Sequence, residues 1–122
     1  MKIFVLLGAL LGGLSVAAGA FGAHALRAQL EPRMLEVFET AARYQMFHAL
    51  ALFAVAWMIQ QTGAVAAHVA GWAFLVGIVL FSGSLYVMAL TGVRGLGAIT
   101  PIGGVAFMIG WGALAVAALK LK

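Results

Sequence analysis

Seven polar residues near the ends of long apolar runs have the side chains that could do chemistry. They are His24, Gln45, His48, Ser82, Ser84, Tyr86 and Thr100. Amide, hydroxyl and imidazole groups can hold a polar ligand, and imidazole can also carry a proton or ligate a metal. The sequence has no cysteine and no serine in a nucleophile elbow, so covalent catalysis has no support. We therefore expect a binding protein rather than an enzyme.

Membrane helices are the elements that must position these residues. Of the 122 residues, 66% are apolar and 8% are charged, whereas about a quarter of the residues in soluble domains are charged. Four apolar runs, at about 3–22, 44–60, 67–90 and 101–119, are long enough to cross a bilayer core of about 30 Å. Backbone groups in lipid must bond within their own segment, so each run is predicted to be a helix. The predicted fold is an all-α membrane protein, a four-transmembrane-helix bundle in one integral membrane domain over residues 1–122.

The only charged stretch lies between the first two runs, at residues 27–46. Pro32 suits the first turn of a helix, and apolar residues then recur at helical spacing, which predicts an amphipathic interfacial segment over about 32–43. Nothing interrupts this pattern before Gln60. Residues 33–60 can therefore form one continuous helix, with its first third at or beyond the membrane interface. The alternative is a separate surface helix that ends at a bend near residues 41–43.

The connectivity places the polar residues at one level of the membrane. With four spans, the ends of the first and third helices and the starts of the second and fourth face the same side. Gln45 and His48 are three residues apart and share a helical face, as do Ser82 and Tyr86 at a spacing of four, whereas Ser84 points elsewhere. Polar groups facing lipid are costly, so we expect these faces to turn inward or toward another subunit. His24 would then join Gln45, His48 and Tyr86 in a polar cluster in one leaflet.

The fourth helix has a clear predicted start. Thr100 is a candidate N-cap, and Pro101 suits the first helical position. The three tryptophans, Trp57, Trp72 and Trp111, are interpreted as residues that anchor or pack at the membrane interface.

A structural and a functional interpretation of the polar cluster both remain open. The side chains can simply satisfy one another and free carbonyl groups between helices. Alternatively, the cluster binds or passes a small solute, a proton or a lipid-like molecule. A zinc site lacks ligands, and no cofactor is expected. Bis-histidine haem or metal binding by His24 and His48 stays a second alternative, because both residues lie at the same level on adjacent predicted helices.

The expected partners are those of a membrane protein. Gly8 and Gly12 form a GxxxG pair, which favours close helix packing, within one chain or in a homo-oligomer. A further function hypothesis is a non-enzymatic scaffold or assembly partner of a larger membrane complex. The basic residues are scattered at the ends of apolar runs and form no basic patch, so we expect contact with membrane lipids and none with nucleic acid.

Four separated motifs resemble one family of small membrane proteins. They are GAFGAHAL at 19–26, TAARYQMFHAL at 40–50, FSGSLY at 81–86, and ITPIGG at 99–104 followed by GW at 110–111. In this order they are similar to domain of unknown function 423 in bacteria, which is related to the eukaryotic transmembrane protein 256 group. The resemblance implies a polytopic helical protein of the bacterial inner (plasma) membrane, and it implies no activity.

Overall fold

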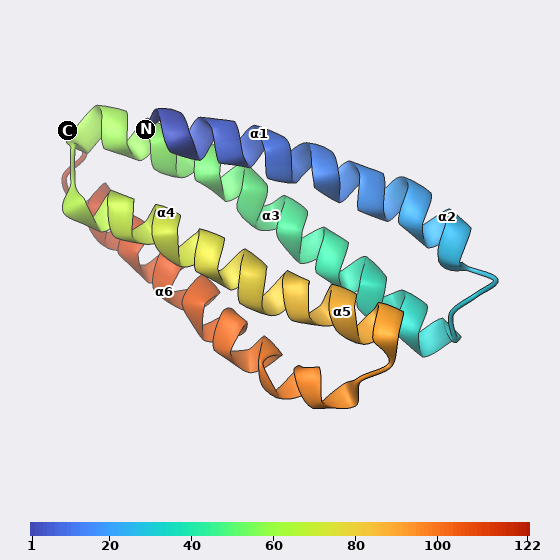
Figure 1. Cartoon of the computed structure of the whole chain (residues 1–122). Helices are drawn as coiled ribbons and strands as arrows, with labels where there is room; N and C mark the ends of the chain where they lie inside the picture. The colour runs from blue at the N-terminus through green and yellow to red at the C-terminus, as the bar shows by residue number, and fades with distance from the viewer.

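The chain folds into helices packed side by side, in a computed structural model that describes residues 1–122 apart from the side chain of Ala23 (Figure 1). The elements in chain order are α1 (Lys2–Ala17), η1 (Ala18–Gly22), α2 (Ala23–Leu26), α3 (Pro32–Thr62), α4 (Val65–Gly77), η2 (Ile78–Ser82), α5 (Gly83–Thr91), η3 (Arg94–Ala98) and α6 (Thr100–Ala118). No strand occurs in the described chain, which confirms the all-α prediction.

Two short π-helical segments are inserted into longer helical rods. η1 joins α1 to α2, and η2 joins α4 to α5, so each rod continues through a single wide turn. The most apolar rods extend over Lys2–Leu26, Val65–Thr91 and Arg94–Ala118. A π-helical turn is rare in proteins and often lies beside a functional site. Here η2 carries both Phe81 and Ser82 toward α3.

α3 is one uninterrupted helix of 31 residues. The bend that would have made a separate surface helix is absent from α3, so the continuous form of the two alternatives is correct. The helix begins with Pro32 in its first turn, as predicted, and it ends where Gly63 adopts a left-handed conformation at φ 60°. At a rise of 1.5 Å per residue it is about 46 Å long, which exceeds the thickness of a bilayer core by about half.

Glycine–phenylalanine contacts set the packing of the bundle. α1 lies against α3, α4 lies against α6, and α3 also packs on α4 and α5 (Figure 1). On the α4–α6 face, Phe74 covers Gly110 and Phe107 covers Gly77. At Gly103 the backbone of α6 comes so close to that of η2 that a Cβ atom would overlap Phe81. Such close approach between apolar helices is what small residues permit.

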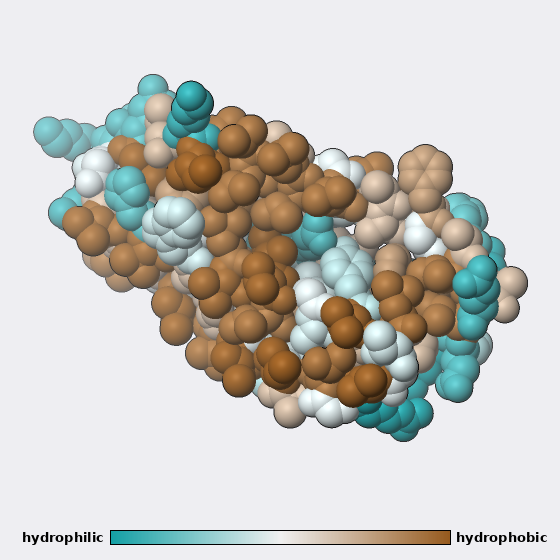
Figure 2. All heavy atoms as spheres, in the orientation of Figure 1, coloured by the Kyte–Doolittle hydropathy of each residue, from teal (hydrophilic) through white to brown (hydrophobic). Residues whose placement is uncertain are grey.

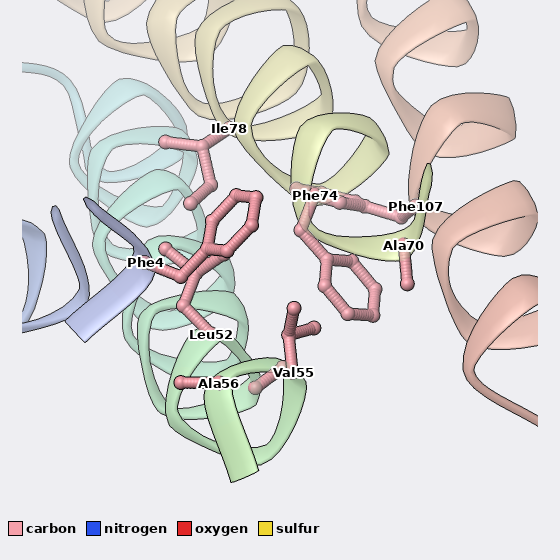
Figure 3. Close-up of a cluster of buried hydrophobic side chains, with 9 residues drawn as sticks. Phe4, Leu52, Val55, Ala56, Ala70, Phe74, Ile78 and Phe107 are labelled. Carbon is pink, nitrogen blue, oxygen red and sulfur yellow. The ribbon is translucent and has the colours of Figure 1, made fainter. Parts of the chain in front are cut away.

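The apolar core lies where these helices meet. Side chains from α1, α3, α4 and α6 converge in it, with Phe4, Leu52, Val55, Phe74 and Phe107 all at most 7% exposed (Figure 3). Each large ring from one helix packs against small or branched side chains from the next, which gives the four rods one continuous interior.

The outer surface of the bundle is apolar along its length and hydrophilic at its ends. Figure 2 shows a broad brown belt between two teal ends. Three rods, Lys2–Leu26, Val65–Thr91 and Arg94–Ala118, are long and apolar enough to cross a membrane. α3 is more polar, because it carries charged residues in its first third and Gln45 and His48 farther along. The chain termini and the turn after α3 lie at one end, and the loops after α2 and α5 lie at the other (Figure 1).

The predicted cap of the last helix is wrong. α6 includes Thr100 in its first turn, Ile99 occupies the cap position, and no side chain caps this end. The Thr100 hydroxyl instead lies 2.7 Å from Ser84 Oγ on α5. The connection through η3 brings the start of α6 beside α5, so the hydroxyl has a partner on the neighbouring helix and not on its own backbone.

Candidate functional site in the groove between α3 and α6

His48 is held by partners on two helices. Its Nδ1 atom lies 2.7 Å from the Tyr44 carbonyl oxygen one turn earlier on α3, and its Nε2 atom lies 3.1 Å from Nε1 of Trp111 on α6. A carbonyl can only accept a hydrogen bond, and an indole N–H can only donate one. His48 is therefore a neutral ring that donates from Nδ1 and accepts at Nε2.

Aromatic contacts fix the plane of the same ring. His48 stacks on Phe107 with ring centroids 3.5 Å apart and an angle of 7° between the planes. Phe74 and Trp111 approach it at steeper angles. With 4% of its surface exposed, His48 is a buried residue enclosed by aromatic rings.

A groove of about 570 Å³ runs along this aromatic cluster between α3 and α6. Its walls are Tyr44, Phe47, His48, Leu50, Phe81, Gly104, Phe107, Met108 and Trp111. Phe47, Leu50 and Met108 are about half exposed or more, so the groove opens on the outer surface of the helices, where lipid would lie. A site of this size and composition accommodates an apolar chain or a flat ring, with few polar contacts to orient it.

Gln45 forms a second, separate link, which joins α3 to α1 and α5. Its Nε2 atom donates to the Leu11 carbonyl oxygen on α1 at 2.9 Å, and its Oε1 atom accepts from the Tyr86 hydroxyl on α5 at 2.8 Å. Ser15 donates to the same Leu11 oxygen at 2.8 Å. Both polar ends of Gln45 are thus satisfied by the chain itself, and one side chain ties α3 to two neighbouring rods.

The serines of η2 and α5 form two further links. Ser82 is fully buried and donates to the Ala41 carbonyl oxygen on α3 at 2.8 Å. Ser84 donates to the Phe81 carbonyl oxygen in its own turn at 3.0 Å. Its only proton is used in that bond, so in the contact between Ser84 and Thr100 the donor is Thr100. These bonds hold η2 against α3 and α5 against α6.

The seven candidate residues are therefore not gathered into one polar cluster. Six of them form four separate interhelical links, and each link is satisfied within the chain. His24 differs, because it is exposed on α2 and takes part in none of the side-chain hydrogen bonds found among the described residues. The prediction that His24 forms a wall beside Gln45, His48 and Tyr86 is wrong in this respect. The structure also disfavours haem ligation by His48, because its Nε2 atom already accepts a hydrogen bond from Trp111.

The sequence interpretation missed the aromatic residues that build the groove. Trp111 was assigned to interface packing, yet its indole N–H is the hydrogen-bond donor to His48, 63 positions away in the sequence. Tyr44, Phe81 and Phe107 were not among the predicted site residues. An indole needs an acceptor when it is buried in an apolar region, and this need is the one signal that could have paired Trp111 with a histidine.

A comparison with known families identifies the chain. The family model described as "Protein of unknown function (DUF423)" matches residues 18–104. The chain belongs to the DUF423 family. The matched residues of this DUF423 member include all seven candidate residues and most of the groove.

Similar proteins cover the DUF423 chain over almost its whole length. The UPF0382 membrane protein YwdK of Bacillus subtilis is 49% identical over 98% of both chains. The UPF0382 membrane protein SERP0230 of Staphylococcus epidermidis is 51% identical, again over 98% of both chains. No solved structure matches the chain. The names of these relatives, together with the apolar helices, show that the protein is an integral membrane protein of unknown activity.

Proposed function

We propose that this protein crosses the bacterial inner (plasma) membrane four times and binds a lipid-like molecule in the groove between α3 and α6, without catalysing a reaction. The observation that carries the proposal is the groove itself, an aromatic-lined hollow of about 570 Å³ that opens sideways from the bundle. Its relatives are bacterial proteins that are named membrane proteins, which supports the location.

The position of α3 supports the four-span arrangement. The three most apolar rods lie alongside α3, and their ends fall at the same two ends of the bundle (Figure 1). Residues 44–60 of α3 lie level with these rods, while the charged residues of its first third are near one hydrophilic end. A crossing α3 would keep this register, whereas a helix lying in the interface plane would expose its buried face.

A lipid-like ligand fits the groove better than a polar solute or a proton does. Most of the lining is aromatic or aliphatic, and a polar solute would gain few hydrogen bonds there. Both nitrogen atoms of His48 are bonded within the chain, so the ring has no open position for relaying a proton. An apolar ligand, in contrast, reaches such a lateral opening directly from the bilayer.

Filling the groove tests this proposal. Gly104 lines the groove, and a Cβ atom there would meet nothing within 4 Å, so Gly104→Leu adds bulk to the hollow without displacing the backbone. Gly112→Leu is the matched control, because it adds the same side chain to the same helix, also in open space, outside the groove.

The measurement is native mass spectrometry of protein released from nanodiscs, which counts the lipid-like molecules that stay bound. We expect the wild type and Gly112→Leu to retain the same ligand and Gly104→Leu to lose most of it. Equal retention by all three proteins would refute binding in the groove.

The alternative function is a scaffold that associates with itself or with a larger membrane complex. The observation that favours it is the open space beside Gly13 on α1 and Gly112 on α6, where a partner helix could approach closely. The same variants separate the alternatives. If Gly112→Leu changes the oligomeric state measured by cross-linking in the membrane, while Gly104→Leu does not, association through the Gly112 side of α6 is the better explanation.

A further inference from the structure

A second hollow lies beside the groove, and this one is charged. It has a volume of about 350 Å³, and it is lined by Ser15, Gly19, Glu39, Ala42, Arg43, Met46 and Phe47. Glu39 and Arg43 are four residues apart on α3, so their side chains lie one above the other on the same helical face. Its floor consists of small buried residues, because Ser15 and Ala42 are 4% and 5% exposed.

The hollow and the groove share a wall. Phe47 lines both, and Arg43 directly precedes Tyr44, which is at the start of the groove. Met46 and Phe47 line the hollow on the side toward the membrane interior, so its wall is apolar there. A single molecule with a charged head and an apolar chain could therefore occupy both spaces, with its chain passing Phe47.

The length of α3 places the charged hollow at a membrane boundary. Arg43 precedes the end of the helix at Thr62 by 19 residues, which corresponds to about 28 Å at 1.5 Å per residue. This distance is close to the thickness of a bilayer core of about 30 Å. If the far end of α3 is at one surface, Arg43 is at the other, at the depth of the lipid phosphates. Glu39 lies about 6 Å farther out, toward the headgroup amines.

We propose that the ligand of the groove is a phospholipid of the ethanolamine class, whose phosphate binds Arg43 and whose ammonium group binds Glu39. This inference rests on the proposed function, since the groove receives an acyl chain of the same lipid. The order of charges along α3 matches that of the headgroup, in which the phosphate is deeper and the amine is farther from the membrane. Arginine presents several N–H donors to a phosphate, and a carboxylate accepts from an ammonium group.

The pair of charges selects against the other common headgroups. A glycerol head is uncharged beyond its phosphate, so it would leave the negative charge of Glu39 without a cation to offset it. A choline head carries a cation but has no N–H group to donate to the carboxylate. Only a primary ammonium group one short linker beyond the phosphate satisfies both side chains of the hollow.

The alternative to be tested is that Glu39 and Arg43 serve only each other as an intrahelical ion pair. The double variant Glu39→Arg with Arg43→Glu keeps opposite charges at the same spacing, but it reverses their order across the membrane boundary. Glu36→Gln is the matched control for charge removal, because it removes one carboxylate that is on the same helix but outside the hollow.

The experiment places the full-length proteins in nanodiscs that contain equal amounts of phosphatidylethanolamine, phosphatidylglycerol and phosphatidylcholine. Native mass spectrometry then gives the class of lipid that remains bound. We expect the wild type and Glu36→Gln to enrich phosphatidylethanolamine at least threefold over its share in the nanodisc. The charge-reversed double variant should lose this enrichment, and Glu39→Gln should shift the bound lipid toward phosphatidylglycerol. Helical circular dichroism confirms that each variant remains folded.

The outcomes separate this inference from the proposed function. If Gly104→Leu loses bound lipid but the reversed charges leave the enrichment unchanged, the groove binds lipid and the headgroup assignment is overturned. If the reversed charges abolish the enrichment and Gly104→Leu retains the lipid, the headgroup site stands and the acyl chain does not lie in the groove. A wild type whose bound lipids match the nanodisc composition refutes the headgroup assignment directly.

Discussion

Replacing Gly103 by alanine should push α6 away from η2. The added Cβ atom would lie 2.8 Å from the carbonyl carbon of Leu80 and from the Cα atom of Phe81, and closer still to the Phe81 nitrogen. Ordinary contacts of this kind start at 3.4 Å. Because these atoms belong to the backbone, no change of rotamer relieves the overlap, and the helices themselves must separate by more than half an ångström.

The neighbouring residue provides the matched control. A Cβ atom at Gly104 meets nothing within 4 Å, so Gly104→Ala changes the backbone preference without changing the packing. Glycine in a helix costs about 0.5–1 kcal/mol relative to alanine, so Gly104→Ala should be neutral or stabilising. Overpacking of an interior by one methyl group costs about 1–3 kcal/mol, so Gly103→Ala should be destabilised by about that amount relative to its neighbour.

The assay is unfolding in mixed micelles with increasing denaturing detergent, followed by helical circular dichroism. Because both variants gain the same side chain on the same turn of α6, the difference between their free energies of unfolding isolates the contact with η2. Equal unfolding midpoints for Gly103→Ala and Gly104→Ala would refute the close approach of the two helices.

Two further predictions concern the polar links. A double-mutant cycle of Gln45→Leu and Tyr86→Phe should give a coupling energy of about 0.6 kcal/mol, the average for hydrogen bonds between membrane helices, and zero coupling would contradict the bond between these side chains. The ¹⁵N chemical shifts of the His48 ring should show a protonated Nδ1 and an unprotonated Nε2, with a change at Nε2 in Trp111→Phe; a protonated Nε2 in the wild type would contradict the assigned donor.

Much of the fold could be predicted from the sequence because the bilayer imposes it. Apolar runs of sufficient length must be helical in lipid, and each of the four predicted runs lies in a helical part of the chain. Pro32 and the absence of any later break favoured a long second helix, and α3 is continuous. The π-helical turns η1 and η2 could not be predicted from the sequence, since their residues are as apolar as those of the helices on either side.

The pairing of side chains was decided by the tertiary structure alone. Lipid is as apolar as the interior of a helix bundle, so apolar residues cover every side of α1, α4 and α6, and their sequences do not reveal which face turns inward. The helical spacing predicted that Gln45 and His48 share one face of a helix. It could not predict that Gln45 bonds to Leu11 and Tyr86 while His48 bonds to Trp111. Close helix contacts at glycine residues determine which helices are neighbours. As a result, the expected polar cluster is replaced by distinct links around an aromatic groove.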